Sequence, residues 1–283
     1  MPDLNPLLLR RLAAACAAIC ISPALLAAPL EDPETDRIAG QIVDSVRLSI
    51  AAGNCDAAVY HLKSGLKSNR PKVALLAGTM YETGLCVKRD WEAAVGYYAL
   101  AYDGGLMKAA QRLAAGYAEP ANGPDTAAAL WWGRQGHGVR LAYCEVGQDA
   151  AADPDRFVAE LGTWQASRLA ACNYIVGVMS TVGAEVVFPE LAGDFGLGGN
   201  VSLRFVPSQA KFEIKMGEAQ EYAMLGVLDG DAVRFRHTKD KTGVFEKAVS
   251  DVANRALARY PQPKGIPAGL TVDTRYTFSI QHR

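Results

Sequence analysis

The sequence has almost no excess of positive or negative charge, and it has few of the histidines that usually bind transition metals. The 283 residues include 29 lysines and arginines against 30 aspartates and glutamates, so the net charge at pH 7 is −1. The protein therefore has no strong field to attract nucleic acid or an anionic membrane surface. Only four histidines are present, none lies near two cysteines, and no C-x-x-C pair occurs, which argues against zinc. We expect no metal, no cofactor and no nucleic-acid partner.

Complete enzyme motifs are also missing. Ser64 with Lys67 and Ser208 with Lys211 fit the S-x-x-K pattern of penicillin-binding enzymes, and residues 241–243 supply a K-T-G. The third motif that those enzymes carry between the S-x-x-K and the K-T-G is absent. Ser64 falls in a predicted helix and Ser208 in a predicted turn. The stretch "GDFGLGG" follows no predicted strand and lacks a full G-x-G-x-x-G. We therefore predict no catalytic residue and no small-molecule substrate, so the chain is not expected to be an enzyme.

Long apolar runs are few, and the clearest one lies at the N-terminus. Arg10 and Arg11 precede "LAAACAAICISPALLAAP", a short alanine-rich run that ends in small residues. This layout is typical of a secretory signal, so we predict that residues 1–28 are cleaved and that the protein is periplasmic or secreted. Two alternatives are a lipoprotein attached through Cys16 and an uncleaved inner-membrane anchor, although Pro23 and the shortness of the run oppose an anchor.

Four cysteines follow the predicted signal: Cys55, Cys86, Cys144 and Cys172. An even number of cysteines in a chain bound for an oxidising compartment favours disulfides. Four cysteines allow three connectivities, and their spacing alone does not choose among them.

A repeat of about 36 residues occupies the region after the signal. The triplet "AAV" occurs at 57–59 and again at 93–95, and other residues recur 35 or 36 positions apart: Ala74 and Ala110, Tyr81 and Tyr117, Asp90 and Asp125. A period of this length indicates stacked pairs of antiparallel helices, because one pair cannot bury its apolar face alone. We predict one such helix from Trp91 to Asp103, ended by Gly104 and Gly105.

The unit "LLAGTMYETGLCVKRDWEAAVGYYALAYDGG" resembles the Sel-like repeat, a relative of the tetratricopeptide repeat. "KAAQRLAAGYAEPANGPDTAAALWWGRQG" matches less fully, and a degenerate unit precedes both, so residues 29–138 are expected to form a helical-repeat solenoid. Cys86 stands where this family usually has glycine. Stacking of the repeats would bring Cys86 close to Cys55, so the resemblance implies a Cys55–Cys86 disulfide and leaves Cys144 with Cys172. It also implies a protein-binding scaffold without chemistry.

Residues 139–186 are predicted to form a bridging helical segment. Asp153 is a suitable N-cap and Pro154 suits a first helical turn. Apolar residues then recur at helical spacing from Phe157 to Met179. We expect one long helix that caps the repeats.

After Val187 the apolar period changes to two. Val201, Leu203 and Phe205 alternate with polar residues, and two later stretches alternate in the same way. An amphipathic helix is predicted from about Phe245 to Tyr260. The chain is therefore predicted to be a multidomain α+β protein, in which a small antiparallel sheet with one packed helix follows the helical repeats.

Residues 187–283 resemble the C-terminal domain of TonB, the energy-transducing protein of Gram-negative envelopes. The resemblance rests on the order of "FPELAGDFGLGGNVSLRF", "FEKAVSDVANRALARYPQP" and "GLTVDTRYTFSI". The turn "VPSQAK" lacks the usual glycine, and "YAMLGVLDGDAVRFRHTKDKTG" is an extra stretch that we expect to form a hairpin around Asp229-Gly230. The long proline-rich spacer of an energy transducer is missing, which argues against a role in energy transduction.

The TonB-like resemblance implies that the last strand pairs with an extended partner segment. The positions that carry over are Leu270, Val272, Thr274, Arg275, Tyr276 and Thr277. We therefore predict a non-enzymatic, periplasmic or secreted adaptor whose repeat groove and strand edge bind segments of envelope proteins, such as an outer-membrane transporter. The alternative is a membrane-anchored, TonB-like component of energy transduction for outer-membrane transport.

Overall fold

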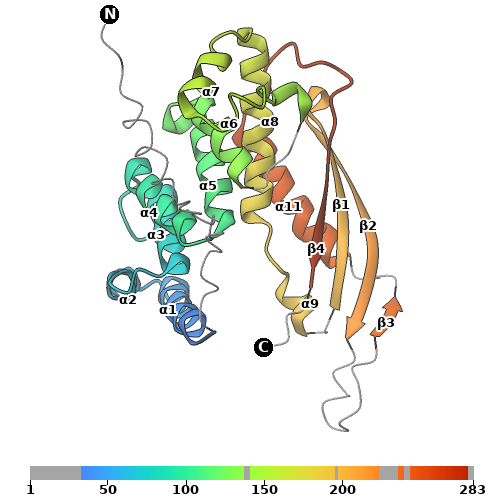
Figure 1. Ribbon diagram of the computed structural model, residues 1–283. Helices are drawn as coiled ribbons and strands as arrows, with labels where there is room; N and C mark the ends of the chain where they lie inside the picture. Colours follow the sequence, from blue (N-terminus) through green and yellow to red (C-terminus); the bar gives the residue numbers. More distant parts are fainter. Residues whose placement is uncertain (1–32, 137–140, 195–196, 223–234, 239–242, 280–283) are drawn as a thin grey trace, which may run out of the picture.

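The computed structural model describes residues 33–136, 141–194, 197–222, 235–238 and 243–279. Within these residues the chain forms a helical array and a four-stranded antiparallel sheet (Figure 1). The prediction of helices followed by a small antiparallel sheet is therefore confirmed at this level. The predicted signal at 1–28 and the predicted turn at Asp229-Gly230 lie outside the described residues.

Three successive helix pairs make up the described N-terminal part. They are α1 (Pro33–Ala51) with α2 (Cys55–Leu66), α3 (Pro71–Thr83) with α4 (Trp91–Asp103), and α5 (Met107–Ala118) with α6 (Thr126–Gln135). The second helix of each pair begins in the same way. A side-chain oxygen of Asn54, Asp90 or Asp125 accepts a hydrogen bond from the backbone N–H three residues later, at 2.9–3.0 Å. The 35–36-residue period thus reflects equivalent helix starts.

Small residues let these helices approach closely. A Cβ atom on Gly78 of α3 would lie 2.5 Å from the ring of Tyr98, which is fully buried on α4. In the next pair, the ring of Trp91 covers Gly116 of α5 in the same manner. Glycine is therefore required at both positions by the neighbouring aromatic ring.

Two disulfides connect segments within the helical part. Cys55, the first residue of α2, is bonded to Cys86 in the turn after α3, and Cys144 is bonded to Cys172. The first pair is the one that the Sel-like resemblance implied, and the second is the pair that it left over. Cys86 has φ of 60°, in the left-handed region that glycine adopts most readily. This backbone conformation accounts for a glycine preference at that position.

The prediction of one long helix after Asp153 is wrong. The segment forms α7 (Pro154–Leu161) and α8 (Ala166–Glu185), with a turn between them. The Thr163 hydroxyl donates to the Glu160 carbonyl at 2.7 Å, and Gln165 before α8 is extended. These local bonds end α7, although the apolar spacing continues into α8. The cap at Asp153 is as predicted, since its carboxylate accepts from two backbone N–H groups.

The sheet has the strand order β3-β2-β1-β4. After the short helix α9 (Glu190–Asp194), β1 (Leu197–Val206) and β2 (Lys211–Tyr222) form a hairpin, and β3 (Phe235–Thr238) extends the sheet beyond β2. The turn from β1 to β2 places Ala210 at φ of 46°, where glycine would be usual. The helix α11 (Val244–Arg259) leads back to β4 (Val272–Phe278), which pairs antiparallel with β1.

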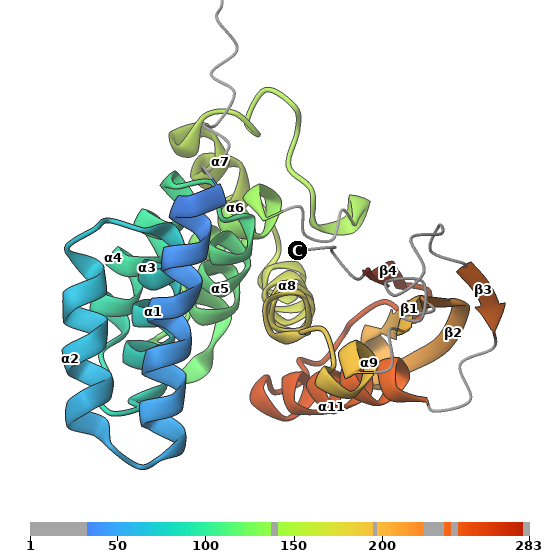
Figure 2. The ribbon, with the colours of Figure 1, turned by 90° about the horizontal axis from the view of Figure 1, so that it is seen from below.

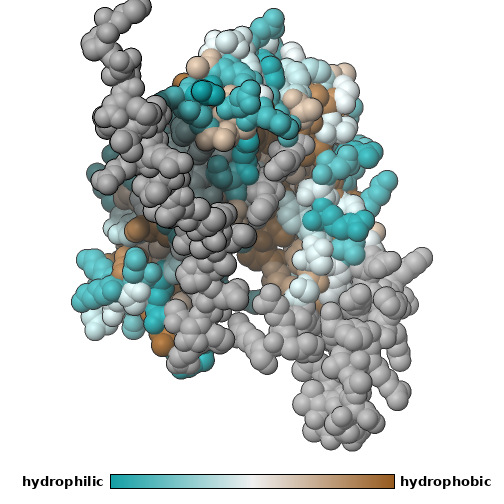
Figure 3. Space-filling view, viewed as in Figure 1, coloured by the Kyte–Doolittle hydropathy of each residue, from teal (hydrophilic) through white to brown (hydrophobic). Residues whose placement is uncertain are grey.

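Helix α8 lies between the helix pairs and the sheet (Figure 2). It packs on α5 and α6 on one side and on α11 on the other, while α11 covers the inner face of β1 and β2. A single hydrophobic cluster runs from Ala114 in α5 through α8 to Phe278 in β4. Figure 3, seen from the same side as Figure 1, shows hydrophobic residues gathered in the middle of the molecule, between the helical array and the sheet. Helices α5, α6 and α8 therefore share one core with α11 and the sheet, whereas α1–α4 pack around two separate hydrophobic clusters.

Among the helices of the described residues, none combines the length and the apolar character needed to cross a membrane.

Candidate binding edge of the sheet

The residues predicted to bind a partner lie on or next to β4, at one edge of the sheet. Val272, Thr274, Arg275, Tyr276 and Thr277 belong to the strand. Leu270 precedes it, partly buried, and its backbone N–H donates to the Pro267 carbonyl at 3.2 Å. The strand begins two residues later than Leu270 because that bond holds the chain in a turn.

Within the part of the chain that the structure describes, the main chain of β4 is paired on one side only. Its register with β1 runs from Phe205↔Val272 to Gly199↔Phe278. Among the hydrogen bonds of the described residues, none joins a main-chain group of β4 to any element besides β1. In an antiparallel strand, alternate residues direct both N–H and C=O away from the neighbour. About half of the seven residues therefore present unpaired donors and acceptors along this edge.

The side chains of β4 alternate between two environments. Val272 and Phe278 are buried on the inner face, where the Phe278 ring stacks on Phe245 of α11 with centroids 4.7 Å apart. Thr274 and Tyr276 lie between them and are half-buried. Burial raises the pKa of the Tyr276 hydroxyl above its ordinary value. The inner face thus anchors the strand and leaves its edge and outer face open.

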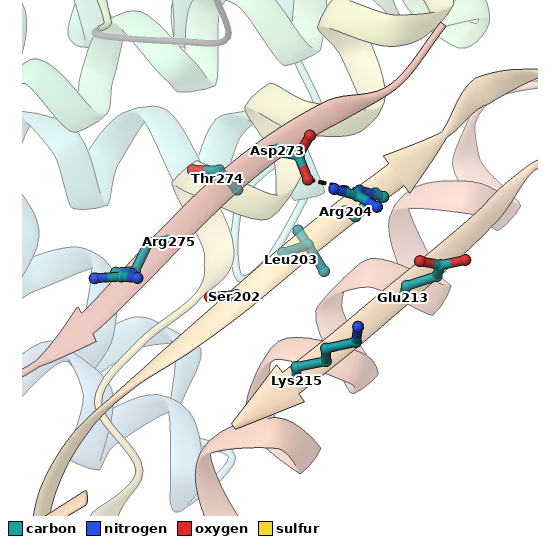
Figure 4. Close-up of a pocket in the computed structure, with 8 residues that line it drawn as sticks. All are labelled: Ser202, Leu203, Arg204, Glu213, Lys215, Asp273, Thr274 and Arg275. Carbon is teal, nitrogen blue, oxygen red and sulfur yellow. Dashed lines mark hydrogen bonds and ion pairs between the residues drawn. The ribbon is translucent and has the colours of Figure 1, made fainter. Parts of the chain in front are cut away.

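Charged residues cover the outer face in two rows that cross three strands (Figure 4). One row consists of Asp273, Arg204 and Glu213, on β4, β1 and β2. The second row consists of Arg275, Ser202 and Lys215 on the same strands. The two rows line a hollow of about 470 Å³.

The first row is internally paired and the second is not. Arg204 Nε donates to Asp273 Oδ1 at 2.7 Å, and this bond raises the pKa of the guanidinium. Glu213 lies on the other side of Arg204 and also forms a 3.9 Å ion pair with Lys211. Among the described residues, no acidic group forms an ion pair with Arg275 or Lys215.

Behind the sheet, an ion-pair network joins four helices. Glu82 of α3 has only 4% of its side chain exposed and forms an ion pair with Arg259 of α11 at 2.6 Å. Arg259 also forms ion pairs with Glu119, after α5, and with Glu185 of α8. Arg112 of α5 lies 3.3 Å from Glu185 and 3.6 Å from Glu82. The network therefore fixes the sheet's helix α11 to the repeat helices.

Hydrogen bonds of buried tyrosines continue this connection. The Tyr98 hydroxyl donates to Glu82, and burial together with that carboxylate raises the pKa of Tyr98. The hydroxyl of Tyr260, directly after α11, donates to the Ala115 carbonyl at 2.8 Å and lies 2.9 Å from Thr181 Oγ1. Burial raises the pKa of Tyr260 to about 12, so the hydroxyl keeps its proton at neutral pH.

The three helix pairs α1–α6 do not present one continuous open groove. Helix α8 covers one side of α5 and α6, and Arg259 reaches Glu82 on α3. The first helix pair is more open, since Leu48 of α1 is 70% exposed and Tyr60 of α2 is 71% exposed. A shallow hollow of about 180 Å³ lies between these two helices, lined by residues that include Gln41, His61 and Ser64.

The two S-x-x-K motifs lie in different parts of the fold, and Lys241 and Thr242 of the K-T-G lie outside the described residues. Ser64 and Lys67 are exposed at the end of α2, whereas Ser208 lies in the β1–β2 turn and its hydroxyl donates to the Ala268 carbonyl at 3.5 Å. Within the described ranges, no group of three histidine, cysteine, aspartate or glutamate side chains is arranged to hold a metal ion.

Comparisons with models of protein families, with curated proteins and with solved structures found no match to this chain.

Sequence reasoning missed the ion-pair network completely. The pair of Arg259 and Glu82 joins residues 177 positions apart in sequence, so no local period reveals it. The one signal available was Glu82, a carboxylate on a face of α3 that is otherwise occupied by small and apolar residues. A charged residue at such a position indicates a buried partner, although it does not identify that partner.

Proposed function

We propose that this chain is a non-enzymatic adaptor of the cell envelope that binds an extended protein segment at the free edge of β4. The observation that carries the proposal is the row of main-chain donors and acceptors along that edge, which no described element pairs. Strand addition uses such groups for affinity and alternate side chains for specificity. A seven-residue strand is long enough for several of these hydrogen bonds.

The firm attachment of the sheet supports this role. A strand edge on a mobile domain would lose affinity through the entropy of positioning it. Here α11 is held by Arg259 to three carboxylates on the repeat side, and Tyr260 donates into α5. We propose that the helix pairs are Sel-like repeats that act as a scaffold for a TonB C-terminal-like sheet.

The proposed location is the periplasm or the exterior. Two disulfides in a chain of this size are typical of proteins that fold in an oxidising compartment. The predicted N-terminal signal agrees with that location. The exposed Leu48 and Tyr60 on the first helix pair form a second surface that we propose contacts the same partner or another one.

Selection of peptides tests the proposal directly. A display library of random extended segments is selected on the full chain without its predicted signal, and the binding site of each selected peptide is mapped by hydrogen exchange. We expect slower exchange at alternate amides of residues 272–278, since only those that face the free edge gain a partner. Tyr60→Ser, a change remote from β4, serves as a control and should leave this binding unchanged.

Two results would contradict strand addition. One is protection confined to α1 and α2 together with loss of binding in Tyr60→Ser, which would assign the activity to the repeats. The other is the absence of any selected peptide that protects β4.

A further inference from the structure

The charges around Arg275 determine which segment fits this edge. Arg275 is exposed on β4, and its register partner on β1 is Ser202, which carries no charge. Beyond Ser202 the next residue in the row is Lys215, another cation. Figure 4 shows the Arg275 side chain extending from β4 on the side away from β1. No described carboxylate pairs with it.

The neighbouring acidic group does not fill this role. Asp273 lies two residues from Arg275 on the same face of β4, but its carboxylate accepts from Arg204 at 2.7 Å. The Arg204 and Asp273 side chains are both more than half exposed, so the pair remains accessible to an added strand. An anion placed opposite Asp273 would meet a carboxylate, whereas one placed opposite Arg275 would meet a cation that no carboxylate of the described residues pairs.

The pleat of the sheet fixes the residues beside that anion. A strand added to β4 alternates its side chains in step with the sheet, so the residues on either side of the one opposite Arg275 point inward. Those inward positions lie next to Thr274 and Tyr276, which are half-buried against the hydrophobic cluster. Apolar side chains suit them because polar ones would lose contact with water.

We propose that the segment bound at β4 carries an aspartate or glutamate opposite Arg275, flanked on both sides by apolar residues. The carboxylate sets the register, because a shift by two residues places it opposite Asp273, where like charges repel, or opposite Thr277, where it loses the attraction of Arg275. A shift by one residue turns it to the apolar inner face. This inference rests on the proposed function and adds the chemistry of the partner to it.

Two charge reversals on the same face of the sheet form a matched test. Arg275→Glu changes the edge strand, and Lys215→Glu makes the same change in charge on β2, which β1 and β4 separate from the added segment. The library of extended segments is selected on the wild-type chain and on both variants, with binding mapped by hydrogen exchange. Both residues are exposed, so the variants should fold, which circular dichroism and thermal unfolding verify.

We expect the wild type and Lys215→Glu to select an acidic residue between two apolar ones, and Arg275→Glu to select lysine or arginine at that position. Replacing the acid by lysine in a selected peptide should weaken binding to the wild type about fivefold to thirtyfold, as attraction becomes repulsion. The same peptide should bind Arg275→Glu more tightly than the acidic peptide does.

Each other outcome overturns a distinct claim. If peptides protect β4 but Arg275→Glu selects the same motif as the wild type, the acidic partner is refuted and strand addition stands. If Lys215→Glu reverses the preference as strongly as Arg275→Glu, the selectivity belongs to the whole face and the register argument fails. If no selected peptide protects β4, both the inference and the proposed function are refuted.

Discussion

Replacing Arg259 by methionine should cost more stability than any other single change in the ion-pair network. Methionine keeps much of the side-chain volume but removes the charge that faces Glu82, Glu119 and Glu185. Glu82 is 4% exposed and Arg259 is 20% exposed, so water compensates the remaining carboxylates poorly. Removing one partner of a buried pair typically costs 3–5 kcal/mol, and the nearby Arg112 brings our estimate to about 3 kcal/mol.

Thermal and denaturant unfolding would measure this cost. For a chain of this size, about 3 kcal/mol lowers Tm by roughly 6–12 °C. Arg255→Met is the matched control, because Arg255 lies one helical turn earlier on α11, is 59% exposed and, among the described residues, forms an ion pair with Glu185 alone, at 3.4 Å. We expect Arg255→Met to cost about 0.5 kcal/mol.

A double-mutant cycle with Glu82→Gln tests whether the two residues act together. The coupling energy between the Glu82 and Arg259 substitutions should be about 1–3 kcal/mol, since each change removes one side of the same contact. Equal costs for Arg259→Met and Arg255→Met, or additive effects in the cycle, would refute the conclusion that this network holds α11 to the repeats.

Three further predictions concern the helical part. Cys55→Ser/Cys86→Ser should lower the free energy of unfolding by about 3–4 kcal/mol, the value for a loop of 31 residues, and a loss below about 1 kcal/mol in denaturant unfolding would contradict this. Gly78→Ala should cost about 1–3 kcal/mol because its Cβ would lie 2.5 Å from a buried tyrosine ring, whereas Gly96→Ala, which meets nothing within 4 Å, should be neutral or stabilising by thermal unfolding. Lys108→Met should raise Tm at pH 7, because burial first and nearby arginines second lower the pKa of Lys108 and make its charge unfavourable in the folded state. The wild-type chain binds fewer protons when folded, so this gain should shrink as the pH rises through the folded-state pKa of Lys108 towards 10.5.

Local periodicity was sufficient to predict several elements. The helix from Trp91 to Asp103 was predicted with the bounds that the structure has, and α11 was predicted to within one residue. Val201, Leu203 and Phe205 are buried on one face of β1, as their alternation indicated. These elements depend on spacing within a few residues, and the sequence contains that information directly.

Features that depend on distant residues or on local bonds were less accessible. The break between α7 and α8 was missed because the Thr163 hydrogen bond ends one helix without interrupting the apolar spacing. At the candidate site, the alternation of β4 was predictable, whereas its edge position came only from resemblance. The register between β4 and β1 was needed to show that Asp273 pairs with Arg204 and that no described carboxylate pairs with Arg275.

The shared core has a consequence for how this chain can be divided. On α8, the Tyr174 ring lies against Phe205 of β1, and Thr181 hydrogen-bonds with Tyr260 after α11. A chain cut after Glu185 would expose this face of α8 to water, and the part that follows would expose the side of α11 that packs on α8. Neither half is therefore a self-sufficient module. Recombination could not exchange the sheet between proteins as an independent unit, and in evolution the repeats and the sheet would be inherited together.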